Sequence, residues 1–281
     1  MPEAISISFE WASRKTSNKK MLAEALSSKS QVLSFVYRFE EALKAAEECE
    51  QISREIDYKP GIAVGLNVRG LAKMYTLEVD ECIRLLNEGE RLDREIGRVD
   101  LLVQSLAFQG FIYRRKGDYQ TALTKLEEGA NICRRIRNLP MLTMILMNQA
   151  YVYNSLNRLD EAISLCEEGE KISYELMLSG LSAFVAGKGI GLYKRNQIDE
   201  AVVLLKKAVE IAMGFEEPIG QQLSFGFLAV GLAATGDKAG AKEALERRAK
   251  ICKEKGFTFD YQQTMEMLRE LEAGQELKLP N

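Results

Sequence analysis

Histidine is absent from this 281-residue sequence. Its absence excludes Ser-His-Asp and Cys-His nucleophilic systems, imidazole general bases and metal sites with histidine ligands. No Gly-rich phosphate loop of the GxxxxGK[ST] type and no dense Asp/Asn calcium loop is present either. We therefore predict no catalytic residues, no cofactor-binding residues and no metal ligands, and we expect the protein not to be an enzyme.

Cysteine pairs are also missing. The five cysteines are odd in number, widely spaced and form no CxxC motif, which argues against both a disulfide framework and a structural zinc site. This usage fits a reducing, cytoplasmic location. Each cysteine falls on an inward-facing position of a predicted helix, where a thiol behaves as a small apolar group, so we predict five buried structural cysteines: Cys49, Cys82, Cys133, Cys166 and Cys252.

Excess charge and long apolar runs are lacking as well. Lys and Arg number 38 and Asp and Glu 41, giving a net charge of -3, so a broad cationic surface for nucleic acid or an anionic bilayer is not expected. The most apolar stretch, residues 223–235, is about half the length of a membrane-spanning helix. Residues 1–20 lack the pattern of a secretory signal. We predict no nucleic-acid partner and no membrane span.

An internal repeat dominates what is present. The segment GDYQTAL at residues 117–123 has counterparts at intervals of about forty residues along the chain. Three positions after an aromatic or apolar anchor, a small residue recurs in each copy: Ala42, Cys82, Ala122, Ala162, Ala201 and Ala241. Apolar residues lie at helical spacing on both sides of each central turn. Each period is therefore predicted to be one helix, a tight turn and a second helix.

The pattern resembles the tetratricopeptide repeat. Its first-helix column of small residues is Ser30, Gly70, Gly110, Ala150, Gly189 and Ala229. The unit differs from the commonest form in its length of about forty residues, which is similar to kinesin light chain, Pins-type adaptors and sensory modules of bacterial signalling proteins. The resemblance implies an all-α fold, a right-handed α-α superhelix of about six hairpins plus a C-terminal capping helix.

Four segments are expected along the chain. Residues 1–20 form an N-terminal segment, either a cap or disordered, and residues 21–258 form the six-repeat solenoid. Residues 259–274 carry apolar side chains on one helical face and are predicted to be a capping helix. Residues 275–281 form a short polar tail that we expect to be disordered.

The resemblance also places the inward face of the first helices along a concave groove. We interpret the chain as a non-catalytic scaffold or adaptor that binds a partner peptide or helix there, with possible homo-oligomers. The alternative is a regulatory or sensory module acting through ligand binding or self-association. If the alignment of the repeats is shifted by one position, the candidate groove residues would instead be buried between repeats. The candidate groove residues are Asn67, Leu71, Tyr75, Phe108, Phe111, Arg115, Met147, Asn148, Tyr151, Ile190, Lys194 and Phe227.

Two features have simpler interpretations. The lysine, asparagine and arginine cluster with which chaperone-binding members of the family grip a terminal carboxylate is not found at the matching positions, so a chaperone tail is disfavoured. Gly187, Gly189 and Gly191 lie within a predicted helix rather than between a strand and a helix. We expect them to mark close helix approach or a locally soft point, since each glycine costs a helix about 1 kcal/mol relative to alanine.

Overall fold

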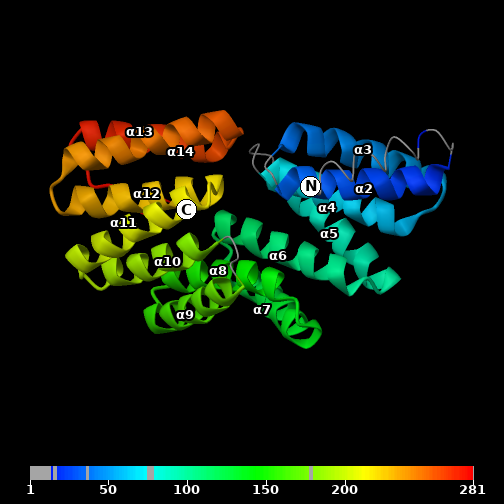
Figure 1. The fold of residues 1–281 in the computed structure, drawn as a ribbon, viewed down its shortest axis with the longest axis horizontal. Coiled ribbons are helices and arrows are strands. Elements are labelled where there is room, and N and C mark those ends of the chain that lie inside the picture. Colours follow the sequence, from blue (N-terminus) through cyan, green and yellow to red (C-terminus); the bar gives the residue numbers. More distant parts are fainter. Residues whose placement is uncertain (1–13, 15–17, 36–37, 75–78, 177–179, 281) are drawn as a thin grey trace. The chain divides into compact units, whose positions relative to one another are not determined.

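Paired antiparallel helices make up the described part of the chain, which in this computed structural model comprises residues 14, 18–35, 38–74, 79–176 and 180–280. No strand occurs within these ranges. The fold is an all-α superhelical repeat of six hairpins and a final helix (Figure 1). The helices are α2 (Lys19–Phe35), α3 (Phe39–Glu55), α4 (Lys59–Met74), α5 (Val79–Ile96), α6 (Val99–Lys116), α7 (Tyr119–Ile136), α8 (Leu139–Ser155), α9 (Leu159–Glu175), α10 (Leu181–Lys194), α11 (Ile198–Gly214), α12 (Pro218–Ala234), α13 (Lys238–Lys255) and α14 (Thr258–Glu272).

The chain divides into two compact units, residues 1–112 and residues 113–281. In the first unit, α2 packs on α3, α4 on α5, and the first helices α2 and α4 also contact each other. In the second unit, each hairpin packs on the next, and the first helices α8, α10 and α12 form a continuous row. Each unit thus has the same nearest-neighbour stacking, which buries the apolar face that a lone hairpin would expose.

The predicted small-residue column explains how the hairpins close. All six residues of the second-helix column, from Ala42 to Ala241, are 0% exposed. On the first helices, a Cβ added at Gly70 would lie 2.8 Å from Leu86, and one at Gly189 would lie 2.9 Å from Leu205. Small side chains are therefore required where the two helices of a hairpin approach each other.

The two kinds of helix differ in how much of their surface is buried. Every residue from Gln222 to Leu232 in α12 is buried, because a first helix has its own partner on one side and neighbouring hairpins on others. In α9, burial is confined to Ala162, Cys166, Gly169 and Ser173, at helical spacing on one face. The second helices therefore present a polar side to water, as the acidic runs in the sequence indicate.

Residues with positive φ end the helices at the period of the repeat. Such a residue at the C-terminal end satisfies carbonyl groups that the helix leaves without a partner. After first helices these residues follow one another at intervals of 40, 39 and 40: Gly117, Asn157, Asn196 and Gly236. After second helices they are Asp57, Gly97, Arg137, Glu216 and Gly256. The forty-residue period is thus fixed in the backbone as well as in the packing.

The ends of the chain differ from the sequence-based expectation in one respect. Most of the N-terminal segment lies outside the described residues, although Arg14 forms an ion pair with Glu48 at 2.7 Å. The tail was expected to be disordered, but Leu277 is 4% exposed and belongs to the apolar core of the second unit. The tail packs against the fold despite its short length, because burial of its leucine and proline side chains against α12 and α14 is energetically favourable.

All five cysteines are buried and reduced, as predicted. Burial raises the pKa of the Cys82, Cys166 and Cys252 thiols to about 12, and that of Cys49 and Cys133 to about 11. Such thiols carry almost no thiolate at neutral pH, so they serve packing rather than nucleophilic chemistry.

Candidate functional site

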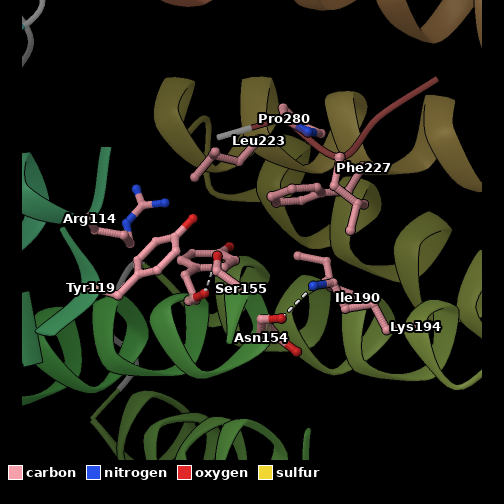
Figure 2. A pocket seen from close by; sticks show the side chains of 11 residues that line it. Arg114, Tyr119, Asn154, Ser155, Ile190, Lys194, Leu223, Phe227 and Pro280 are labelled. Carbon is pink, nitrogen blue, oxygen red and sulfur yellow. Dashed lines mark hydrogen bonds between the residues drawn. The ribbon is translucent and has the colours of Figure 1, made fainter. Parts of the chain in front are cut away.

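A hollow of about 210 Å³ lies along the first helices of the second unit (Figure 2). We call it the α8–α12 pocket, because α8, α10 and α12 supply most of its wall. The last turn of α6, the start of α7 and the tail complete it. Its lining residues are Arg114, Tyr119, Tyr151, Asn154, Ser155, Ile190, Lys194, Leu223, Phe227, Leu279 and Pro280.

Two aromatic rings from neighbouring first helices form the apolar part of the wall. The ring centroids of Tyr151 on α8 and Phe227 on α12 are 5.8 Å apart and the planes are tilted by 34°. Both side chains are buried, and the Tyr151 hydroxyl donates to the Ala183 carbonyl at 3.3 Å. Because its hydroxyl is bonded to α10, Tyr151 presents a fixed ring rather than a mobile one.

Two cations add positive charge to this wall. The Arg114 guanidinium carbon lies 5.4 Å from the centroid of the Tyr151 ring, a cation–π arrangement. Burial, and then the neighbouring Arg115 charge, lower the pKa of Arg114 to about 10. Lys194 Nζ donates to the Asn154 carbonyl, and burial lowers the pKa of Lys194. No Asp or Glu is among the described lining residues.

An amide lies between these groups. Asn154 is 2% exposed, and its Nδ2 donates to the Gly187 carbonyl at 3.1 Å. Its Oδ1 is buried without a hydrogen-bond partner among the described residues. A buried acceptor without a donor costs free energy, so a ligand N–H group at this wall would find one open acceptor.

The structure brings four of the predicted groove residues together in this pocket. They are Tyr151, Ile190, Lys194 and Phe227. Met147 lies beside them and packs against the core of the second unit. Asn148 is instead 2% exposed and donates along its own helix to the Met144 carbonyl at 2.9 Å.

Arg115 has a different neighbour. Its side chain is 7% exposed and forms an ion pair with Asp260 of α14 at 3.3 Å. The residue just before it, Arg114, is the one that lines the pocket. Successive side chains on a helix point about 100° apart, so Arg114 faces the pocket while Arg115 points towards α14.

The remaining predicted residues belong to the first unit. Asn67 is 0% exposed and lies in a buried network, where its Nδ2 donates to Asp93 at 3.2 Å and its Oδ1 accepts from Ser105 at 2.9 Å. Phe108 is buried, whereas Leu71 and Phe111 are half-buried. Tyr75 lies outside the described residues. In this unit, Asn67 and Phe108 therefore occupy packed interior positions.

Seven lining residues were not among the predicted groove residues. Arg114, Asn154, Ser155 and Leu223 lie on the same first helices as the predicted residues, and Tyr119, the first residue of α7, had been identified as the aromatic anchor of its repeat. The tail residues Leu279 and Pro280 complete the set. The leucines of the tail, Leu277 and Leu279, were the available sequence signal, because segments that remain solvated contain few large apolar residues.

The described residues also bear on two other classes of site, a metal site and a membrane span. Among the described residues, no group of three or more Cys, Asp and Glu side chains is arranged to hold a metal ion. No helix in the described ranges combines the length and apolar character needed to cross a bilayer.

Comparisons with known proteins give structural neighbours. No protein-family model matches the sequence, and no curated protein matches it. A solved Rap protein complexed with Competence and Sporulation Factor is similar over 90% of this chain and 76% of that one, with a TM-score of 0.65 and 14% identity. The apo form of the quorum sensor NprR from B. thuringiensis is similar over 91% of this chain and 77% of that one, with a TM-score of 0.58 and 14% identity.

A third neighbour comes from a different kind of protein. BtubC (BKLC) from P. vanneervenii is similar over 76% of this chain and 90% of that one, with a TM-score of 0.57 and 18% identity. At these identities the likeness establishes the helical-repeat fold alone.

Proposed function

We propose that this protein, whose fold is a helical repeat of the tetratricopeptide type, is a non-catalytic interaction module that binds an extended peptide segment of a partner protein in the α8–α12 pocket. The observation that supports the proposal is the combination of an aromatic wall and two half-buried cations in one hollow, with no Asp or Glu among its described lining residues. A similar solved protein, the Rap protein, is complexed with Competence and Sporulation Factor, which shows that a related fold accommodates a bound molecule.

The size of the pocket favours a peptide anchor over a large ligand. A volume of about 210 Å³ lies below the roughly 300–1,000 Å³ typical of sites for drug-sized molecules. It is enough for one or two side chains. A peptide with one apolar anchor against Tyr151 and Phe227 would fill it while the rest of the segment follows the first helices.

The charge of the pocket favours an acidic group on that peptide. Arg114 and Lys194 are both half-buried, which lowers the pKa of each, and a partly desolvated cation gains more from an anion than an exposed one does. We therefore propose a partner segment with an apolar anchor and a nearby Asp or Glu. A micromolar complex needs about 8 kcal/mol of net binding free energy, which a few such contacts supply.

The proposal is tested with fluorescently labelled twelve-residue peptides in which the spacing between one apolar residue and one acidic residue varies. Anisotropy titrations are made with the wild type and with Lys194→Gln. Loss of a charge-assisted hydrogen bond is expected to weaken acidic peptides by about tenfold and to leave their Gln-containing counterparts unchanged. Lys207→Gln, which removes an exposed lysine of α11, is the matched control.

Two results would reject the pocket as a peptide site. One is that no peptide in the series binds more tightly than millimolar. The other is that Lys194→Gln and Lys207→Gln bind the acidic peptides equally.

A second candidate function is regulation by ligand-controlled self-association. It is supported by the structural likeness to NprR, which is described as a quorum sensor. Light scattering over a hundredfold range of protein concentration, with and without a bound peptide, separates the two. A constant monomer mass in both series contradicts the regulatory alternative, and a mass that changes when peptide is added supports it.

A further inference from the structure

The tail, residues 275–280, lies against the same helices that form the proposed binding site. Figure 1 shows it returning from α14 towards α12, and Figure 2 shows Pro280 beside Leu223 and Phe227. Leu279 and Pro280 are themselves part of the pocket wall. One side of the pocket is therefore closed by a segment of the chain itself.

A helix-ending motif turns the tail back towards the stack. Gly274 has a φ of 73° and donates to the Leu271 carbonyl at 3.1 Å, while Gln275 donates to the Glu270 carbonyl at 2.9 Å. These two bonds form a Schellman motif, in which a left-handed residue reverses the path of the chain. The direction of the tail is thus set by backbone geometry at the end of α14.

From Glu276 to Leu279, burial alternates from residue to residue, and Pro280 is buried as well. Leu277 is buried, Leu279 is half-buried and packs against the core, whereas Glu276 and Lys278 are exposed. A period of two is that of an extended segment with one side facing a surface. The tail therefore adopts the same form as the extended peptide that we propose for a partner.

Two hollows receive the apolar side chains. Leu277 lines one with Tyr193 of α10, Val230 of α12 and Leu271 of α14. Pro280 approaches α12 so closely that a Cβ added at Gly226 would lie 3.1 Å from its Cγ. The tail is therefore closely packed against α12 and does not merely lie along the protein surface.

The attachment is apolar rather than hydrogen-bonded. Among the described residues, no hydrogen bond joins residues 276–280 to a helix. A strand added to a sheet edge would be fixed by backbone bonds, whereas the described residues of this segment contact the helices through buried side chains. A competing segment that presents similar side chains can thus replace it without breaking any backbone hydrogen bond.

We infer that the tail acts as an intramolecular ligand, in which Leu279 and Pro280 cover the α8–α12 pocket while Leu277 is held in the neighbouring hollow, and that a partner peptide must displace this segment to bind. This inference rests on the proposed function. It also specifies the apolar positions of the partner: an extended segment with leucines two positions apart followed by proline, the arrangement of Leu277, Leu279 and Pro280.

The size of the effect follows from tethering. A segment joined by a short linker has an effective concentration in the millimolar range. If the same segment in trans binds an open pocket with a Kd of about 0.1 mM, a tether at roughly 1 mM keeps the closed form about tenfold in excess. Release of the tail is therefore expected to tighten binding of a competing peptide by about tenfold.

The test uses a fluorescein-labelled peptide with the sequence GQELKLPN, residues 274–281, and full-length protein. The double variant Leu277→Asp/Leu279→Asp should free the tail and bind the peptide about tenfold more tightly than the wild type does. Leu279→Asp alone, at a half-buried site, should have an intermediate effect. Lys278→Ser, at the exposed position between the two leucines, is the matched control and should bind as the wild type does. Circular dichroism checks that each variant keeps its helices.

The inference is overturned if folded wild type, Leu279→Asp and the double variant all bind the peptide equally, or if none of them binds it. The acidic peptides used to test the proposed function are titrated against the same proteins. If these bind the wild type and the released variants equally, peptide binding stands and the tail inference fails. If they bind none of the proteins while GQELKLPN prefers the released variants, the proposed function fails and occupation of the pocket by the tail stands.

Discussion

Arg115, in the last turn of α6, donates from its guanidinium to Asp260, in the first turn of α14, at a distance of 3.3 Å. The pair joins positions 145 residues apart in the sequence. Both side chains are almost wholly buried, and the guanidinium carbon also lies 3.9 Å from the centroid of the Phe259 ring. Arg248, itself 0% exposed, is 3.8 Å from the same carboxylate oxygen. Asp260 therefore lies between two buried cations.

Removal of this carboxylate is expected to be costly. Asp260→Ala leaves Arg115 and Arg248 buried without their shared anion, so the free energy of unfolding should fall by about 3–5 kcal/mol. Urea denaturation followed by circular dichroism measures it. Glu272→Ala is the control, because its ion pair with Lys242 at 3.0 Å is exposed and should contribute less than about 1 kcal/mol. Equal losses in the two variants would show that the buried pair has no special role.

Gly169 tests the close packing of α9 against α10. A Cβ at this position would lie 2.1 Å from two ring carbons of Phe184, which is fully buried and cannot move aside. Gly169→Ala is therefore expected to destabilise the fold by about 1–3 kcal/mol. Gly214, the last residue of α11, has no atom within 4 Å of its added Cβ, so Gly214→Ala should be neutral or stabilising by up to about 1 kcal/mol. Both are read from thermal unfolding midpoints. A stabilising Gly169→Ala would contradict the packing of α9 on α10.

The buried carboxyl of Asp93 should make the free energy of unfolding depend on pH, and the direction of this dependence can be predicted. Burial raises the pKa of the Asp93 carboxyl, against hydrogen bonds from Ser105 at 2.6 Å and Asn67 that act in the opposite direction. Because the pKa is higher in the folded state, the folded protein binds more protons between the ordinary and the raised pKa, and this contribution to stability is lost as pH rises through that window. Asp93→Asn removes the effect. The stability of Asp93→Asn relative to wild type should therefore increase from pH 4 to pH 8 in urea titrations.

Asp100 supplies a control of opposite sign. Its hydrogen bonds from Arg98 lower the pKa of the Asp100 carboxyl, so its contribution is present above the ordinary pKa and is lost as pH falls. The relative stability of Asp100→Asn should therefore decrease as pH rises from about 2 to about 5, the range around and below the ordinary pKa of an Asp carboxyl, and should then stay constant to pH 8. Parallel trends in the two variants would show that the environment of Asp93 does not determine its titration.

The cysteines are expected to be unreactive in the native protein. With thiol pKa values of about 11 to 12, and with burial of all five side chains, reaction with a coloured disulfide reagent at pH 8 should be at least about a hundredfold slower than in 6 M guanidinium chloride. The rate is followed by absorbance. Rapid native labelling of even one thiol would show that its helix opens readily and that its burial is incomplete in solution.

The repeat was predictable because one signal recurs many times. A small residue every forty positions, such as Ala122 and Ala162, has a single physical explanation, the close approach of two helices, and the structure confirms it at all six copies. The three glycines of α10 are explained in the same way: a Cβ at Gly187 would meet the Cys166 sulfur at 2.7 Å. Packing against direct neighbours depends on spacing along the chain, and spacing is visible in the sequence.

The candidate site was predictable only in part. Tyr151 and Phe227 were predicted as site residues from their positions in the repeat. Arg115 was predicted as well, but Arg114 is the residue that faces the pocket, because neighbouring residues on a helix point in different directions. Asn67 was expected to face a groove, yet a partner 26 residues away, Asp93, holds it in the interior. Such choices depend on which side chains meet across helices, and no period in the sequence encodes them.

The sequence by itself determined the class of fold, the number of hairpins and the buried, reduced state of the cysteines, because each follows from local spacing and composition. Only the tertiary structure decided where Asp260 meets Arg115 and where the tail lies. Both depend on contacts between segments far apart in the chain, and the free energy of burying Leu277 against α12 and α14 exists only once those helices have been brought together.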